Sequence, residues 1–242
     1  MTEEGEVRFG GARIHYRVVR SPKRHKTVEI TVDEPGAVTV AAPVEMSAER
    51  VEATVRRRAG WIYRHASTVA TPPAPRRFVS GESLPYMGRS VRLEVHSSDS
   101  KSIGIRFHHW QFDVDVPSWL EGDKRQTELR AGFESWYRER AALKLPSRVD
   151  RIAQLLGVTP TAVLIRDQQR RWASCAPDGT LRFNWRALMV SPALLDYVVA
   201  HELAHLRVRS HNAEYWAFVA QGIRDYRLRR QRLRDRGLTL PL

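Results

Sequence analysis

The sequence predicts an α+β fold, in which a β-rich N-terminal region with one helix (residues 1–122) precedes a mainly helical domain (residues 123–242). A length of 242 residues suits one large domain or two small ones. Short segments that alternate apolar and polar residues dominate the first part, as expected for half-buried strands. Apolar residues at helical spacing dominate the second part. One of its helices carries two histidines four residues apart.

The first elements follow from the change in hydrophobic period. Alternation predicts strands over residues 12–19, 26–32 and 37–41, with a turn at residues 33–36. Ser47 is a suitable cap for a helix over residues 47–64. Its predicted buried face consists of Val51, Val55, Ala59 and Ile62.

The middle of the chain predicts a linker or surface loop, followed by hairpins. The Pro-rich segment 71–75 is typical of a stiff connection. Further strands are expected at residues 77–79, 81–88, 91–95, 103–107 and 111–116. No repeat of fixed period is visible in the sequence.

The C-terminal part predicts helices around three short strands. Apolar residues at helical spacing indicate one helix over residues 124–143 and a second over residues 147–156, ended by Gly157. Strands are expected at residues 163–166, 171–175 and 181–185. Ser191 and Pro192 then suit the cap and first position of a long apolar helix that runs into His201.

Composition limits the classes of protein. The 40 Lys and Arg residues outnumber 27 Asp and Glu, which gives a net charge of +13 and suggests polyanionic partners such as nucleic acid. Nearly all of this positive charge is arginine, a bias that genome composition also produces. No apolar run reaches the ~18 residues of a membrane span. Cys175 is the only cysteine, and the N-terminus does not look like a secretory signal, so we expect a cytoplasmic protein without disulfides.

The string His201-Glu-Leu-Ala-His205 predicts a metal site. On a helix, residues four apart lie on the same face, so His201 and His205 can direct two imidazoles at one ion. Glu202 lies about 100° around the helix, which leaves its carboxylate beside that ion. A carboxylate in this place can take a proton from a water that the ion makes acidic.

Two residues compete for the third ligand position. His211 follows His205 by six residues, which matches the long motif H-E-x-x-H-x-x-G-x-x-H of zincins. Glu214 is the alternative, although imidazole is the commoner partner in a compact site of this kind. The sequence departs from that motif at Val208, which stands at the glycine position, and it has no methionine after the motif for a Met-turn.

These segments together resemble the YgjP-like metallopeptidases, relatives of the SprT-like zincins. Arg171-Trp-Ala-Ser-Cys175 is similar to the family's W-G-S-C element, with Ala173 where glycine is usual. Leu181–Arg186 is similar to its L-x-x-N-x-R strand. Leu195–Leu206 resembles the active-site helix, and His211–Trp216 resembles the segment with the third ligand.

The resemblance implies a zincin-like C-terminal domain, with helices packed on a small sheet and the HExxH motif on the central helix. It implies zinc on His201, His205 and His211, with Glu202 as general base. The strands at residues 171–175 and 181–185 would then lie near the active-site helix, where an edge strand could pair with an extended peptide. Cys175 is a candidate fourth ligand or redox switch, or simply an inert thiol. Candidates for stabilising the oxyanion are Tyr215, Asn184 and Arg186.

We therefore expect a zinc-dependent hydrolase, most simply a metallopeptidase that acts on a protein or peptide. Manganese and cobalt accept similar ligands. One alternative is a metal-dependent hydrolase of nucleotides or phosphoanhydrides, with phosphate held by Arg166, Arg170, Arg171, Arg182 and Arg186. Another is a protease recruited to nucleic acid through the basic segments 20–26 and 224–236. The substrate and the oligomeric state do not follow from the sequence.

Overall fold

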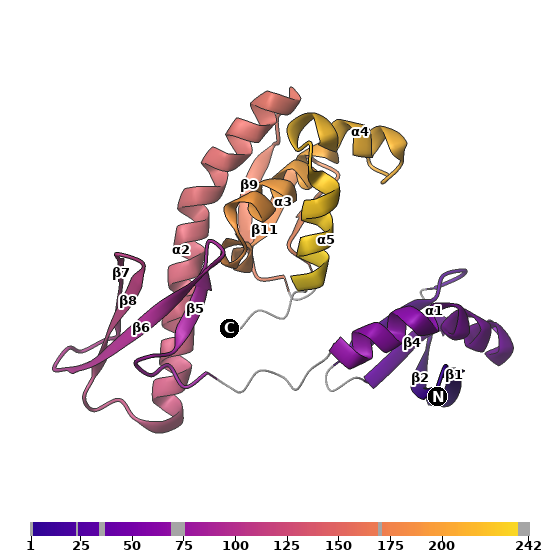
Figure 1. The fold of residues 1–242 in the computed structure, drawn as a ribbon, viewed down its shortest axis with the longest axis horizontal. Coiled ribbons are helices and arrows are strands. Elements are labelled where there is room, and N and C mark those ends of the chain that lie inside the picture. Colours follow the sequence, from indigo (N-terminus) through magenta and orange to yellow (C-terminus); the bar gives the residue numbers. More distant parts are fainter. Residues whose placement is uncertain (1, 23, 34–36, 69–75, 169–170, 237–242) are drawn as a thin grey trace. The chain divides into compact units, whose positions relative to one another are not determined.

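The computed structural model describes residues 2–22, 24–33, 37–68, 76–168 and 171–236 (Figure 1). The chain divides into two compact units, Met1–Pro75 and Arg76–Leu242. The predicted linker at residues 71–75 and most of the predicted turn at residues 33–36 lie outside the described residues. No helix in the described part of the chain is both long and apolar enough to span a membrane.

The first unit is a four-stranded sheet with one helix on it. Its elements are β1 (Thr2–Phe9), β2 (Ala12–Ser21), β3 (Glu29–Asp33), β4 (Ala37–Pro43) and α1 (Ala48–Thr68). The strand order is β1-β2-β4-β3, with β2 parallel to β4 and the other pairs antiparallel. The predicted apolar face of α1 packs in the core of this sheet. Strand β1 was not predicted, because Val7 is its only fully buried side chain among the described ones.

The second unit begins with a sheet of the same design. Its elements are β5 (Ser83–Tyr86), β6 (Arg89–Ser98), β7 (Gly104–His108), β8 (Gln111–Pro117) and α2 (Gly122–Leu156). The order is β5-β6-β8-β7, and here too the central pair, β6 and β8, is parallel while the outer pairs are antiparallel. The structure thus contains a repeat of four strands and a helix that the sequence does not reveal as a period.

Helix α2 is continuous over 35 residues, although the sequence predicted separate helices over residues 124–143 and 147–156. Pro146 lies inside it, and a proline removes one helical hydrogen bond. Buried side chains on both sides of the proline, Leu145 and Val149, hold the two halves in one core, which compensates for that loss. The predicted cap Gly157 is confirmed and adopts the left-handed conformation with φ 65°.

The boundary between the units differs from the one that the sequence suggested after residue 122. The sheet β5–β8 and the C-terminal elements share a single hydrophobic core, which includes Phe112, Phe133 and Leu203. Helix α2 is common to both parts. Residues 76–122 therefore belong to the second unit and not to the first.

The remaining elements lie on one side of α2 in the second unit (Figure 1). They are β9 (Ala162–Arg166), β10 (Ala173–Cys175), β11 (Thr180–Asn184), the 3₁₀ helix η1 (Trp185–Met189), α3 (Pro192–Ala204), α4 (Ala213–Gly222) and α5 (Tyr226–Arg236). The small sheet has the order β10-β11-β9. As predicted, Ser191 caps α3 and accepts a hydrogen bond from the Leu194 backbone N–H, with Pro192 at the first position. Arg148 and Arg151 of α2 both pair with Asp196 of α3.

Candidate metal centre

The end of helix α3 brings two histidines together. The helix is apolar on most sides and largely buried, so its position in the core is fixed by packing. His201 lies in its last turn and His205 at its C-cap, with ring centroids 5.1 Å apart. The spacing in the sequence thus produces the expected pairing on one helix face.

A short turn brings His211 to the same place. After α3, the backbone N–H of Val208 still bonds to the Ala204 carbonyl at 2.9 Å, which keeps the chain tightly wound. Val208 is not among the described residues with positive φ, so the turn does not require the glycine of the long zincin motif. His211 then precedes Asn212, whose side chain caps α4 by accepting from the Tyr215 backbone N–H.

The three imidazoles form a cluster with the geometry of a metal site. One ring nitrogen from each of His201, His205 and His211 lies within 4.8 Å of the other two. The Nε2 atoms of His201 and His211 are 3.2 Å apart. Tetrahedral zinc with Zn–N bonds of about 2.0–2.1 Å places two ligand nitrogens about 3.3–3.4 Å apart. The closest pair therefore already has the separation that zinc requires.

The protonation state of the three histidines also suits the binding of a cation. Burial, with the neighbouring histidines, lowers the pKa of His201 to about 3. Burial lowers the pKa of His205 and of His211 as well. The Nδ1 of His205 lies 3.2 Å from the Val208 carbonyl, which favours a proton on Nδ1 and a lone pair on Nε2. Neutral imidazoles with inward lone pairs are the form that binds a metal ion.

Glu202, which follows His201 on α3, is buried. Its exposed fraction is 6%. Burial raises the pKa of its carboxyl to about 7, while the charge of Arg171 and a hydrogen bond from the Cys175 backbone N–H act in the opposite direction. A carboxyl with this pKa exchanges protons near neutral pH, as a general base must.

Two other residues that the sequence singled out lie outside the cluster. Glu214, the alternative third ligand, is exposed at the start of α4 and does not belong to the group of possible ligands. Cys175 is not part of that group either. Its thiol lies 3.6 Å from the Arg209 guanidinium, and burial raises the pKa of the thiol.

The three candidates for oxyanion stabilisation already have other partners. The hydroxyl of Tyr215 donates to the His201 carbonyl at 2.8 Å. Asn184 donates to the Gln168 and Arg171 carbonyls at 2.7 and 3.2 Å, which ties down the segment before β10. Arg186 binds the Asp167 carboxylate and stacks over Trp185. These contacts give all three side chains a structural role.

Arg230 of α5 is a neighbour of the site that the sequence did not suggest. Its guanidinium lies 4.4 Å from the centroid of the Trp216 ring, which in turn stacks on His211. The positive charge of Arg230 contributes to the low pKa of both His201 and His211. Only the packing of α5 brings Arg230 here, so no local motif could have identified it among the arginines of that helix.

One family model covers most of the chain, and two solved structures show limited similarity to it. A family model described as YgjP-like, metallopeptidase domain, matches residues 26–236. The metallopeptidase zymogen of Pyrococcus abyssi abylysin is 22% identical over 36% of this chain and 89% of its own, with a TM-score of 0.34. The metallopeptidase zymogen of Methanocaldococcus jannaschii jannalysin is 20% identical over 37% of this chain and 95% of its own, with a TM-score of 0.32. No curated protein matches the sequence.

Proposed function

Because the chain belongs to the YgjP-like metallopeptidase domain family, we propose that His201, His205 and His211 hold a zinc ion and that Glu202 is the general base of peptide hydrolysis. The observation that carries this proposal is the convergence of three ring nitrogens within 4.8 Å beside a buried carboxyl. Zinc in such a site acts as a Lewis acid and lowers the pKa of a bound water to about 7.

Glu202 moves the proton in this mechanism. Its carboxylate accepts a proton from the attacking water and passes it to the nitrogen of the leaving amine, so that the C–N bond breaks as a neutral amine departs. Burial raises the pKa of this carboxyl, so its protonated form is accessible and the group can act as an acid after it has acted as a base.

Strand β10 is our candidate for the edge that aligns the peptide. It is one of the two outer strands of the sheet β10-β11-β9. The backbone of Cys175, at the end of β10, contributes to the pKa of Glu202, so this end of the strand lies close to the proposed base. An extended peptide that pairs with a free strand edge gains main-chain hydrogen bonds without a requirement for its sequence.

The decisive experiment is the Glu202→Gln variant, with Glu214→Gln as a matched control on an exposed position of α4. We expect both variants to retain zinc in elemental analysis. Cleavage of unfolded proteins should fall by about 10²–10⁴-fold in Glu202→Gln and stay near wild type in Glu214→Gln. Undiminished cleavage by Glu202→Gln would refute the mechanism.

The same preparation tests the phosphate alternative. Of the arginines proposed to hold phosphate, Arg186 is paired with Asp167, and Arg170 lies outside the described residues. Nucleotides and unfolded proteins are therefore assayed side by side. Turnover of nucleotides alone would replace the peptidase proposal by the phosphoanhydride one.

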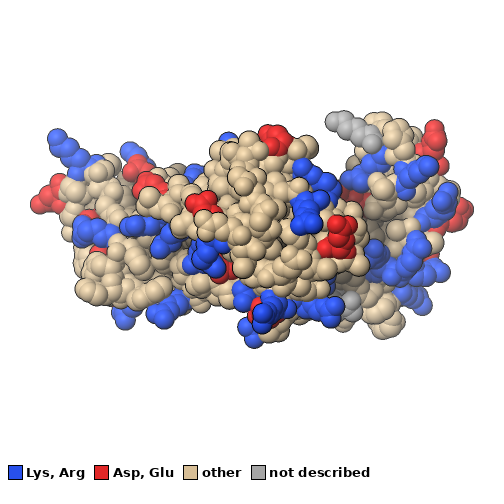
Figure 2. Space-filling model, turned by 90° about the horizontal axis from the view of Figure 1, so that it is seen from above, with Lys and Arg blue, Asp and Glu red and all other residues tan. Residues whose placement is uncertain are grey.

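The face of the molecule in Figure 2 does not favour a nucleic-acid function. Lys and Arg side chains are spread across that face, and Asp and Glu side chains lie among them. Several arginines of α5 are also engaged within the protein, since Arg229 donates to the Ala193 carbonyl and Arg236 to the Met189 carbonyl. Recruitment to nucleic acid stays a proposal that a binding assay at several salt concentrations would test, because phosphate contacts weaken as salt rises.

A further inference from the structure

The chain contains the same arrangement of four strands and a helix twice. We call β1–β4 with α1 the first module and β5–β8 with the start of α2 the second module, and we compare the second with the first. The two sheets match in register as well as in topology. The hairpin pair Phe9–Ala12 corresponds to Tyr86–Arg89. The last pair of the central parallel ladder is Ser21–Pro43 in one sheet and Ser98–Pro117 in the other. The paired positions of one module therefore have defined counterparts in the other, and differences between counterparts are informative.

In the first module, an arginine side chain fills the space between the central strands and the start of the helix. Arg20 of β2 donates to the carbonyls of Pro43, at 3.1 Å, and Met46. It also pairs with both carboxylate oxygens of Glu3 on β1, at 3.0 and 2.8 Å. Its side chain is only 15% exposed. The space is thus built for a guanidinium group, with two main-chain acceptors and a carboxylate around it.

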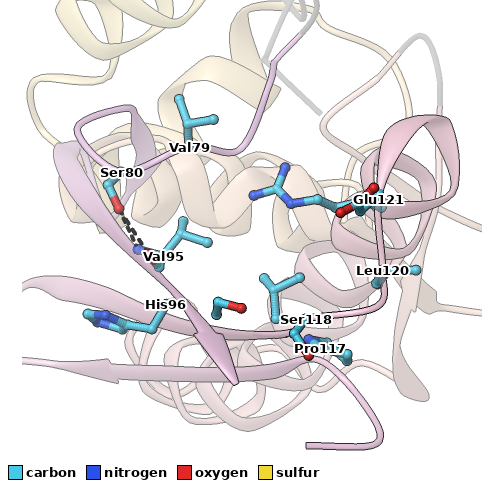
Figure 3. A pocket seen from close by; sticks show the side chains of 11 residues that line it. Val79, Ser80, Val95, His96, Pro117, Ser118, Leu120 and Glu121 are labelled. Atoms are coloured by element: carbon cyan, nitrogen blue, oxygen red, sulfur yellow. Dashed lines mark hydrogen bonds between the residues drawn. The ribbon is translucent and has the colours of Figure 1, made fainter. Parts of the chain in front are cut away.

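In the second module, the same space is open. The counterpart of Arg20 is Ser97, the residue before Ser98 on β6. The counterpart of Glu3 is Ser80, whose hydroxyl bonds to the backbone of Val95 (Figure 3). Both large side chains are therefore replaced by serine. A cavity of about 380 Å³ lies there, lined by these serines and by Pro117 and Leu120, which correspond to Pro43 and Met46.

The cavity keeps the acceptors of a guanidinium site. Pro117 and Leu120 line it just as Pro43 and Met46 surround Arg20. The acid comes from a different position, because Glu121 stands at the N-cap of α2 and lines the cavity, as Figure 3 shows. Its side chain makes no cap hydrogen bond.

The one arginine that lines the cavity does not replace Arg20. Arg125 of α2 donates instead to the carbonyls of Arg77 and Phe78, at 3.1 and 2.8 Å, in the segment before β5. Among the residues that line the cavity, Glu121 is the one carboxylate and Arg125 the one guanidinium. The donors of Arg125 are turned to the carbonyls of residues 77 and 78.

We propose that this cavity binds an arginine side chain from a polypeptide partner. The guanidinium takes the place that Arg20 occupies in the first module, with the Pro117 and Leu120 carbonyls and Glu121 as its acceptors. A volume of about 380 Å³ lies within the range of ligand sites. Planar guanidinium donors fit fixed carbonyl and carboxylate acceptors better than a lysine ammonium does, so the site selects arginine.

The test uses N-acetyl-L-arginine amide as the probe and N-acetyl-L-citrulline amide as its uncharged isostere, in an NMR titration of the full chain. We expect the arginine derivative to shift resonances around the cavity and to bind at least about tenfold more tightly than the citrulline derivative. Equal affinities, or no saturable binding of either probe, would overturn the proposal.

Variants localise the binding. Ser97→Arg supplies the missing side chain from within and should remove binding of the probe. Ser90→Arg adds the same charge to an exposed position of β6 away from the cavity and should leave binding unchanged. Glu121→Gln should weaken binding several-fold without filling the cavity. Binding that survives in both Ser97→Arg and Glu121→Gln would place the site elsewhere and refute the assignment.

Discussion

Tyr215 lies against all three histidines of the candidate metal centre, yet its hydroxyl is turned to the backbone. The hydroxyl donates to the His201 carbonyl, which the end of α3 would otherwise leave without its helical partner, because the His205 N–H bonds to Glu202 instead. We predict that Tyr215→Phe lowers the free energy of unfolding by about 1–3 kcal/mol. Cleavage by the metal-loaded variant should stay within about tenfold of wild type. Denaturant titration and steady-state kinetics measure the two effects, and a loss of about 10²–10³-fold in kcat would instead reveal an oxyanion role.

The pair of Glu3 and Arg20 should make the first unit sensitive to acid. The hydrogen bond from Arg20 lowers the pKa of Glu3 below its ordinary value of 4.5. A lowered pKa in the folded state means that the unfolded chain binds a proton more readily, so this contribution to stability is complete above pH 4.5. It disappears as the pH falls through the lower pKa of the folded state. Thermal unfolding of wild type and Glu3→Gln between pH 2 and 7 measures it, and identical pH profiles would contradict the prediction.

At the residue scale, spacing predicts ligands better than it predicts supporting contacts. Four- and six-residue intervals follow from helix geometry and a short turn, so His201, His205 and His211 were identifiable as a group. The partners of Asn184 and Arg186 come from a loop 13–19 residues earlier in the sequence. No local pattern encodes such contacts, so the sequence alone offered these residues only as candidates for oxyanion stabilisation.

The turn between β5 and β6 fixes the second sheet against the start of α3. The Met87 N–H donates to the Leu188 carbonyl at 2.7 Å. Gly88 has φ +80°, and a Cβ there would lie 2.7 Å from the Cα of Ser191. We predict that Gly88→Ala destabilises the second unit by about 2 kcal/mol or more, from backbone strain and this clash together.

The repeated module offers a control for Gly88→Ala. Gly11 is its counterpart in the turn between β1 and β2, and a Cβ there would meet nothing within 4 Å. Gly11→Ala should therefore change the unfolding free energy by less than about 1 kcal/mol. Similar losses in both variants, measured by denaturant titration, would show that neither the positive φ of Gly88 nor its contact with Ser191 matters.

At the element scale, most strands and helices were predictable because their burial alternates with a clear period. The helix expected over residues 47–64 is α1, and the strand expected over residues 37–41 is β4. Helix α2 was divided in error because Pro146 is a strong local signal for a helix end. The packing of α2 on two sides of one core outweighs that signal, and a single sequence does not contain this tertiary information.

The division into two units predicts two responses to removal of metal. The candidate ligands all lie in the unit Arg76–Leu242. A ligand that binds the folded state at about 1,000 times its Kd stabilises it by about 4 kcal/mol. In a domain of this size, each kcal/mol changes Tm by about 2–4 °C. Chelation should therefore lower the transition of the second unit by several degrees and leave that of the first unchanged. Calorimetry with and without chelator tests this, with His211→Ala as a variant that should respond weakly.

At the scale of the whole molecule, the sequence predicted the fold class but not the repeat of four strands and a helix. The two modules share topology and register, yet counterparts such as Arg20 and Ser97 carry different side chains. Their loops differ in length too, so the period is not constant. The two modules share their strand pairing but not their sequence, so the repeat is visible only in the structure.

Helix α2 has a practical consequence for anyone who produces the metal-binding part alone. A fragment beginning at residue 123 would lack β5–β8 but keep the side chains that pack beneath them, including Leu129, Phe133 and Trp136, all buried in the intact chain. An uncovered apolar stripe of this kind drives self-association. Such a fragment should collect in inclusion bodies, whereas an expression boundary at residue 76 keeps the stripe covered and the product dispersed.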